Sequence, residues 1–221
     1  MAVVYDICRW IGVITGYPFR WIVFKTKFYY ENEKAKRKVK GGALIISNHF
    51  NTFDFVHNVF VFFPRKLYVV ASEHAFKNFI IRLGMKFWGG IKADRTTKST
   101  KFIFESIREL KKGHLVQIFP EGHNTDDGNI QSFYPSYILI ALKANVPIVP
   151  LIMDGHYGLF KRVHQMIGEP IYLSEYVREG KVTKGEIERL NEIVHAKALK
   201  LREEIDLRIQ AHKNKRGGKK N

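Results

Sequence analysis

The chain has 221 residues, of which 45% are hydrophobic and 14% aromatic, so it can bury a sizeable core and is not disordered as a whole. Lys and Arg number 37 against 21 Asp and Glu, and the resulting formal net charge of +16 favours an anionic partner. The single cysteine, Cys8, excludes an internal disulfide bond and favours a reducing compartment.

The excess positive charge lies mainly in two segments that flank the centre of the chain. Residues 25–40 and residues 211–221 each carry +5, and residues 41–210 together carry only +5. A nucleic-acid-binding domain more often carries its charge on the folded recognition element itself. Basic flanks either help to keep the protein soluble or attract it to a membrane surface with anionic lipids.

Residues 1–30 are predicted to form two short helices that are separated near Gly16-Tyr17-Pro18. Apolar residues recur at helical spacing in the first, and the second mixes Trp and other apolar residues with Lys and Arg. Such helices are typical of the membrane interface, but the same pair could pack on the protein's own core. No charge-free run reaches the roughly 18 residues of a spanning helix, and no cleavable signal is evident. We therefore expect a peripheral or monotopic protein on the cytoplasmic face of a membrane.

From residue 41 onward, short apolar runs alternate with helical patterns. The predicted strands are 43–47, 67–71, 115–119, 148–153 and 166–173. The predicted helices are 52–62, 77–88, 98–112, 134–144 and about 185–209. The strands are almost continuously apolar, as expected when both faces of a sheet are covered. The alternation predicts an α/β fold, a layered domain whose mainly parallel or mixed central sheet is flanked by helices.

Four regions are predicted along the chain. They are N-terminal interfacial helices with a basic linker at 1–40, the α/β domain at 41–176, a C-terminal helix at 177–211 and a basic disordered tail at 212–221.

The first strand of the α/β domain leads into His49 and Asp54. Within one helix, residues five apart would point about 140° away from each other, at about 100° per residue. The two side chains can meet only if a turn separates strand from helix, and Asn51-Thr52 supplies suitable residues. Asp54 would then orient the imidazole, leaving its other ring nitrogen to take a proton from a substrate hydroxyl. The pattern alone does not establish this, because an aspartate also stabilises a helix N-terminus.

Four sequence blocks, in this order and at these spacings, resemble the glycerolipid acyltransferase family typified by 1-acyl-sn-glycerol-3-phosphate acyltransferases of the PlsC type. The family signatures N-H-x-x-x-x-D, G-x-I-x-x-x-R, F-P-E-G and V-P-I-V-P match residues 48–54, 89–95, 119–122 and 146–150. The resemblance covers roughly residues 41–173. Each block is weak by itself, and together they are specific.

The resemblance implies transfer of an acyl chain from acyl-CoA or acyl carrier protein to the free hydroxyl of a lysophospholipid. It implies that His49 is the general base and Asp54 its catalytic partner. The transfer is expected to be direct, since no G-x-S-x-G nucleophile motif is present. The predicted substrate-binding residues are Asn48, Arg95, Glu121, Gly122, His123 and Asn124.

The expected partners are a membrane surface with anionic lipids, the lysophospholipid acceptor and the acyl donor, and no nucleic acid. No cofactor beyond the donor substrate and no metal is expected.

The sequence departs from the family pattern where the acceptor phosphate is usually held. The third block usually continues as T-R, but His123 and Asn124 stand here. A Lys-Gly pair often follows a later Phe, but Tyr134-Pro135-Ser136 follows Phe133. Arg grips a phosphate with two parallel hydrogen bonds, which Asn cannot replace.

Two acceptors remain open as a result. One is lysophosphatidic acid, held by Arg95, His123 and a lysine such as Lys92 or Lys98, and family membership favours this choice. The other is a different lysolipid whose head group carries less charge or masks its phosphate.

Three other classes of function compete with acyl transfer. A lipid or thioester hydrolase could use the same base to activate water. A basic nucleic-acid-binding protein would use the net charge but would leave the four blocks unexplained. A metal site at His49, Asp54 and His57 would crowd three ligands across one turn.

Overall fold

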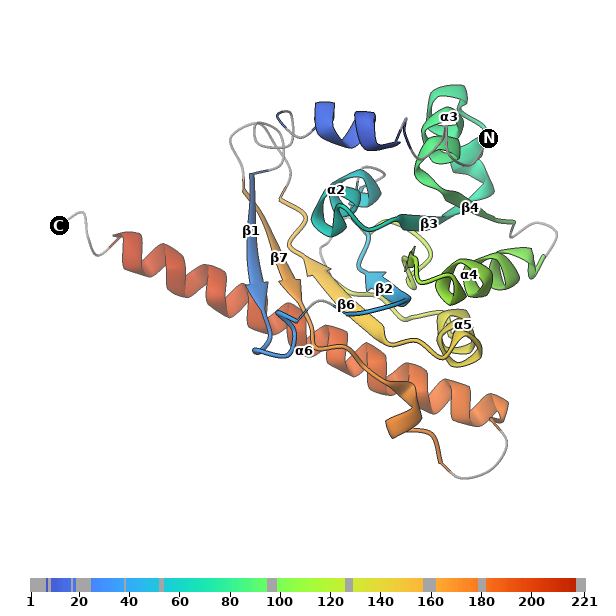
Figure 1. Cartoon of the computed structure of the whole chain (residues 1–221). Coiled ribbons are helices and arrows are strands. Elements are labelled where there is room, and N and C mark those ends of the chain that lie inside the picture. Colours follow the sequence, from blue (N-terminus) through green and yellow to red (C-terminus); the bar gives the residue numbers. More distant parts are fainter. Residues whose placement is uncertain are drawn as a thin grey trace.

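The computed structural model describes residues 7, 9–16, 18, 25–37, 39–51, 54–94, 99–125, 129–156, 162–178 and 182–217. Seven strands form one central sheet in the order β1-β7-β6-β2-β5-β3-β4 (Figure 1). All neighbouring strands are parallel except β6 and β7, which are antiparallel. The predicted α/β fold with a mostly parallel, mixed sheet is therefore confirmed.

The strands are β1 (Lys25–Tyr30), β2 (Ala43–Ser47), β3 (Leu67–Ser72), β4 (Gly90–Ala93), β5 (Leu115–Ile118), β6 (Ile148–Met153) and β7 (Arg162–Ile167). The helices are α2 (Asp54–Phe62), α3 (Phe79–Trp88), α4 (Lys101–Lys111), α5 (Ser136–Ala144) and α6 (Lys184–Gly217). Two short 3₁₀ helices, η1 (Glu73–Phe76) and η2 (Leu173–Glu175), complete the elements. Residues 9–16 are also helical.

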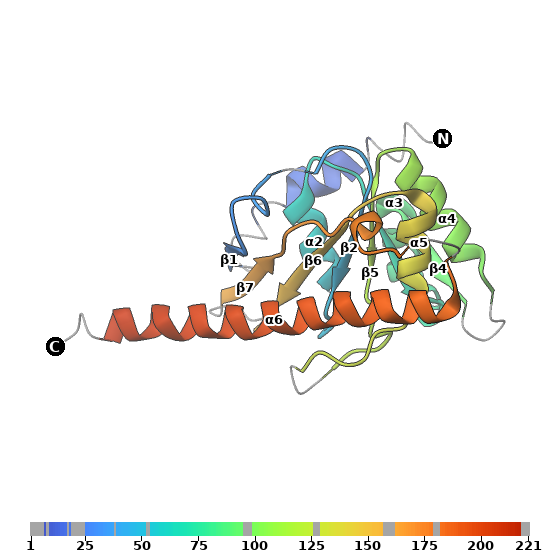
Figure 2. The ribbon, with the colours of Figure 1, turned by 90° about the horizontal axis from the view of Figure 1, so that it is seen from below.

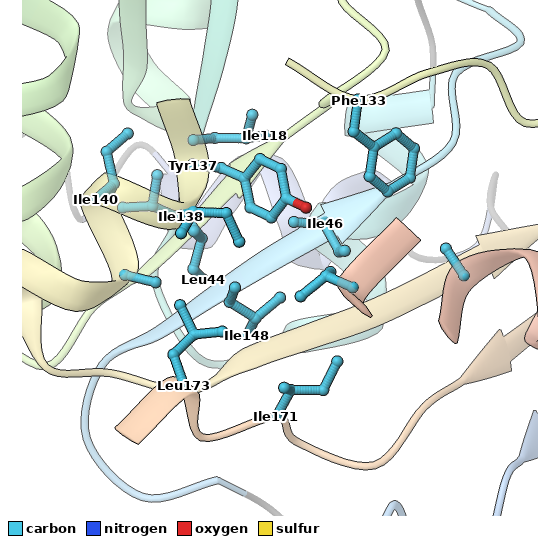
Figure 3. Close-up of a cluster of buried hydrophobic side chains, with 14 of the residues drawn as sticks. Leu44, Ile46, Ile118, Phe133, Tyr137, Ile138, Ile140, Ile148, Ile171 and Leu173 are labelled. Atoms are coloured by element: carbon cyan, nitrogen blue, oxygen red, sulfur yellow. The ribbon is translucent and has the colours of Figure 1, made fainter. Parts of the chain in front are cut away.

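The central strand β2 is buried on both faces, which explains its uninterrupted apolar sequence. Ala43 and Ile45 face the cluster formed with α2, whereas Leu44 and Ile46 belong to the larger cluster on the opposite face. Figure 3 shows Leu44 and Ile46 beside Ile148 of β6 and next to side chains of α5. Successive residues of one strand thus hold both layers of helices in place.

The long helix α6 lies along the face of the sheet that carries α5 and contacts both β6 and β7 (Figure 2). Its buried residues repeat at intervals of three or four and are Leu190, Val194, Ala198, Leu201 and Ile205. This is the apolar face that the sequence predicts. The helix continues to Gly217, so the expectation of disorder from residue 212 is wrong for residues 212–217.

The expectation of a second N-terminal helix is wrong where the structure describes that region. Residues 19–24 lie outside the described ranges, and residues 25–30 form β1, which pairs with β7 in parallel register. The segment Lys-Thr-Lys-Phe-Tyr-Tyr contains the β-branched and aromatic residues that favour strands. Since β1 belongs to the sheet, the fold begins before the predicted boundary at residue 41.

Two further strand predictions need correction. The strand predicted at 166–173 lies instead at Arg162–Ile167, and the chain then makes only an isolated bridge between Ile171 and Ile148. Pro170 has no N–H for a ladder, so it opposes continuation of a strand. The short edge strand β4 at Gly90–Ala93 was not expected, because its four residues are too few to show a period.

A buried carboxylate on α4, Glu109, stabilises the start of β5. One carboxylate oxygen accepts hydrogen bonds from Arg108 (3.0 Å) and Lys112 (2.9 Å), and the other lies 3.1 Å from Nδ1 of His114. Burial by itself raises the pKa of Glu109, but the bonds from Lys112, Arg108 and His114 outweigh it and lower the pKa to about 2.

Glu109→Gln is expected to lower the free energy of unfolding at neutral pH. The folded-state pKa lies below the ordinary value of 4.5, so the stabilisation is present above that pH and is lost as the pH falls toward 2. The difference between variant and parent in the urea midpoint should therefore shrink as the pH is lowered from about 6 to about 3. Glu105→Gln, on the same helix, is the control. A difference that does not change with pH would contradict this account.

Candidate active site

The pair predicted from the sequence forms where β2 ends. After Ser47 the chain turns, and α2 begins with Asp54. Nδ1 of His49 lies 2.9 Å from Oδ2 of Asp54. The intervening turn is held by a hydrogen bond from the Asp54 N–H to the Asn51 carbonyl (2.9 Å), as the geometric argument requires.

The carboxylate of Asp54 is fully buried and organises this turn. Its Oδ2 also accepts the backbone N–H groups of Phe50 (2.7 Å) and Asn51 (2.9 Å). An ionised carboxylate can only accept hydrogen bonds, so Nδ1 of His49 carries the hydrogen of the pair. The other ring nitrogen, Nε2, is then the acceptor that a general base needs.

A second buried carboxylate, Glu121, holds the backbone of the histidine. One of its oxygens accepts the His49 N–H (3.2 Å), and the other accepts the Gln131 N–H (2.9 Å). Burial raises the pKa of Glu121, and the two backbone hydrogen bonds act in the opposite direction. The His49 carbonyl in turn accepts the Thr125 N–H (2.8 Å). Both peptide groups of His49 are therefore fixed by neighbouring loops.

Asn48 was predicted to bind substrate, but its side chain is used inside the protein. Its amide nitrogen donates to the Met153 carbonyl (2.9 Å), and its amide oxygen accepts the Met153 N–H (2.9 Å). The residue is also buried. Asn48 thus ties the end of β2 to the end of β6, which favours a positioning role over contact with substrate.

His49 opens onto a cleft of about 410 Å³. The His49 ring stacks on Phe119, with ring centroids 4.0 Å apart. Three residues predicted to bind substrate, Gly122, His123 and Asn124, line the same cleft. The cleft therefore brings together the predicted base and half of the predicted substrate-binding residues.

A larger, mostly apolar groove of about 680 Å³ continues from the cleft. Both are lined by Val70, Ala71, Ser72, Phe119 and Gly122. The groove extends between the start of α4 and the start of α6. Such a volume lies within the usual range of small-molecule sites.

Some site residues are placed elsewhere or were not recognised from the sequence. Arg95 lies outside the described residues. His74 lines the cleft and Lys184 lines the groove, although neither belongs to a sequence block that would have indicated a role. Only the packing of η1 and α6 against the sheet reveals them.

The arrangement does not favour the alternative metal site. His57 is fully buried, with Nε2 2.7 Å from the Thr26 hydroxyl and Nδ1 2.9 Å from the Gln165 amide nitrogen. Its ring nitrogens therefore face β1 and β7. Within the described ranges, no group of three or more His, Cys, Asp or Glu residues could hold a metal ion.

One further cavity, of about 230 Å³, is lined by residues at the beginning of β2 and β5, such as Ala43 and Leu115. Neither His49 nor Asp54 lines it. We therefore place the chemistry in the cleft at the other end of these strands.

Fold and site together define an α/β protein with a His–Asp pair suited to general-base chemistry at the carboxyl edge of its sheet. The sequence profile of the Acyltransferase family matches residues 27–154, which is more than half of the chain. The chain therefore belongs to the Acyltransferase family.

Its relatives include two proteins named 1-acyl-sn-glycerol-3-phosphate acyltransferase. The one from Cocos nucifera is 30% identical over 111 residues, covering 47% of this chain and 35% of that protein. The one from Bacillus subtilis (strain 168) is 25% identical over 148 residues, covering 65% of this chain and 73% of that protein. The chain thus matches only about a third of the coconut protein's length.

A solved structure shares the fold. The 1-acyl-sn-glycerophosphate (LPA) acyltransferase PlsC from Thermotoga maritima superposes with a TM-score of 0.61 at 22% sequence identity. The superposition covers 85% of this chain and 75% of that chain.

Asp54→Asn is expected to lower kcat by at least about 100-fold, because the amide cannot stabilise a protonated imidazole as a carboxylate does. The melting temperature of the Asp54 variant should differ little from that of the parent. Asp154→Asn is the matched control, because Asp154 is also buried and bonded to a histidine (His164, 2.6 Å), but this histidine, unlike His49, does not line the cleft. Activity of the Asp154 variant should stay within about tenfold of the parent. Equal losses in the two variants would contradict a special role for Asp54.

Glu121→Gln is expected to reduce both stability and kcat. The new NH₂ group would face a backbone N–H, leaving a buried donor unsatisfied at a cost of about 1–3 kcal/mol. If Glu121 positions His49, the loss appears in kcat, and an increase confined to KM would argue instead for direct contact with the acceptor. The exposed Glu203→Gln serves as the control in urea denaturation and in steady-state kinetics.

Proposed function

We propose that the protein transfers an acyl chain from a thioester, acyl-CoA or acyl carrier protein, to the free hydroxyl of a lysophospholipid. The observation that carries this proposal is the His49–Asp54 pair, whose histidine lines a largely apolar cleft, in a chain of the Acyltransferase family. The names of the relatives favour 1-acyl-sn-glycerol-3-phosphate as the acceptor, which would give phosphatidic acid.

The mechanism needs one base and no covalent enzyme intermediate. Nε2 of His49 takes the proton of the acceptor hydroxyl while the hydroxyl oxygen forms a bond to the thioester carbonyl carbon. The carbon–sulfur bond then breaks, and the thiolate leaves with the proton returned by His49. Asp54 stabilises the imidazolium that exists between these steps, because its buried carboxylate is bonded to Nδ1.

The groove beside the cleft supports a substrate with a long apolar chain. Its lining includes Phe102, Ile103, Ile118 and Leu139. Since it shares a wall with the cleft at Phe119, a chain lying in the groove would have its reactive end near His49. We assign the groove to one of the two acyl chains that meet in the reaction.

The choice of acceptor head group depends on the positive charge around the cleft and the groove. Asn124 lines the cleft and Tyr134 lines the groove, at positions where family members usually place cations. Binding of lysophosphatidic acid therefore depends on Arg95 and on His123, which lines the cleft. This reduced positive charge is the specific observation that favours the second candidate, a lysolipid with a less charged head group.

Membrane attachment through the N-terminal segment is part of the proposal. In the helix at residues 9–16, Val13 is buried, whereas Trp10, Ile11 and Ile14 are exposed. Ile11 and Ile14 are available to the membrane interface, whereas the half-exposed Trp10 ring packs against Phe63, with ring centroids 4.7 Å apart. Among the described residues, no helix is both long and apolar enough to cross a bilayer.

A survey of acceptors tests the function. The purified protein should acylate lysophosphatidic acid in preference to lysophosphatidylglycerol, lysophosphatidylethanolamine and lysophosphatidylcholine, with acyl-CoA and acyl carrier protein compared as donors. His49→Ala should abolish transfer with each acceptor. Strong transfer to another lysolipid with none to lysophosphatidic acid would establish the second candidate, and release of free fatty acid instead of acylated lipid would establish a hydrolase.

A further inference from the structure

We propose that helix α3 carries a second membrane-docking surface, which holds the active-site cleft close to an anionic bilayer. We call this surface the α3 outer face and define it by Phe79, Arg82, Leu83 and Lys86. The inference rests on the proposed lipid substrate, but it is tested by binding to vesicles, which does not require turnover.

The α3 outer face combines exposed apolar and cationic side chains. Phe79 is 65% exposed and Leu83 is 43% exposed, and Arg82 and Lys86 are exposed beside them. Their spacing of three and four residues places all four on one side of the helix. The Arg82 guanidinium lies 5.7 Å from the centroid of the Phe79 ring. A ring that enters lipid beside a cation that stays at the head groups is typical of an interfacial helix.

The opposite side of α3 forms part of the active-site cleft. Ile81 and Met85 line the cleft into which His49 opens, and Met85 is buried. One short helix therefore separates the site of chemistry from the α3 outer face. A bilayer that contacts this face would therefore be held about one helix diameter, roughly 10 Å, from the cleft that contains His49.

The N-terminal helix lies beside the C-terminal end of α3, at a residue on the side opposite to the α3 outer face. Gly12 in that helix approaches Trp88, the last residue of α3, since a Cβ at Gly12 would lie 3.8 Å from the indole nitrogen. Figure 1 shows the helical segment near the N-terminus and α3 on the same side of the sheet. Ile11 and Ile14 are exposed on the N-terminal helix, so two neighbouring helices present apolar side chains to the surroundings.

The charge of the α3 outer face favours an anionic bilayer over a second copy of the chain. Helix α3 contains Arg82 and Lys86 and no acidic residue, and Lys77 precedes it. A twofold symmetric contact would bring each face against itself and place these like charges together. Anionic lipid head groups instead attract each nearby cation.

The test is a vesicle-flotation titration with the full chain. Vesicles of phosphatidylcholine with phosphatidylglycerol are compared with vesicles of phosphatidylcholine alone. The partition coefficient is measured, rather than the presence or absence of binding, because the N-terminal helix should still bind when the α3 outer face is altered. We expect Phe79→Ser/Leu83→Ser to lower the coefficient by about tenfold on both vesicle types. Arg82→Glu/Lys86→Glu should lower it chiefly on anionic vesicles, and this difference should diminish at high salt.

The matched control makes the same chemical change on other helices. Phe104 on α4 is 70% exposed and Leu207 on α6 is 65% exposed. Phe104→Ser/Leu207→Ser should leave the partition coefficient unchanged. If the α3 variants partition like the parent, or if both double variants lose the same amount, the proposal is wrong. If the α3 variants instead convert a dimer to a monomer in size-exclusion chromatography, a second copy occupies this face and the bilayer proposal is overturned.

The outcome can be separated from the function proposed above. Transfer to a short-chain lysolipid that dissolves as monomers should proceed equally in the parent and the α3 variants. Vesicle binding without any acyl transfer would refute the function and leave the docking surface standing. If the protein transfers acyl chains but its vesicle binding does not depend on the α3 outer face, the function stands and the docking surface is refuted.

Discussion

The active site depends on a buried carboxylate at the point where a strand becomes a helix. A charge without solvent must be compensated by hydrogen bonds, and Oδ2 of Asp54 receives them from two backbone N–H groups and from the ring of His49. The same three contacts that compensate the charge also fix the path of the turn and the direction of the imidazole. Folding of this turn therefore also orients the imidazole of His49.

Further hydrogen bonds connect the turn around His49 to helix α6. Glu121 links His49 to the N–H of Gln131, and the Gln131 carbonyl lies 3.0 Å from Nε2 of His195 on α6. Asn191, one turn earlier on α6, donates to the Phe133 carbonyl (3.0 Å). The long helix thus fixes the loop around Gln131, whose N–H is bonded to Glu121. Its buried face contributes to the core, and its polar contacts contribute to the geometry of the site.

The sequence could predict those features that depend on neighbouring residues. The sequence predicts β2, β5 and β6 from their apolar runs and α6 from its periodic apolar face. It predicts the His49–Asp54 pair from a turn between strand and helix. Features that depend on distant pairing could not be predicted in this way. Strand β1 is stabilised by β7, more than a hundred residues away, and the use of Asn48 requires β6 to lie beside β2. The exposure of Phe79 likewise appears only when the packing of α3 is known.

The distribution of charge in the folded protein separates attachment from chemistry. Lys184 is the only Lys or Arg among the described residues that line the cleft or the groove, although the chain carries a formal charge of +16. An apolar groove can accept an acyl chain because little charge has to be desolvated there. Described cations such as Arg82 and Lys86 lie instead on exposed surfaces. Within the described part of the chain, positive charge is therefore kept where it stays hydrated, and the walls of the cleft and the groove avoid the cost of desolvating it.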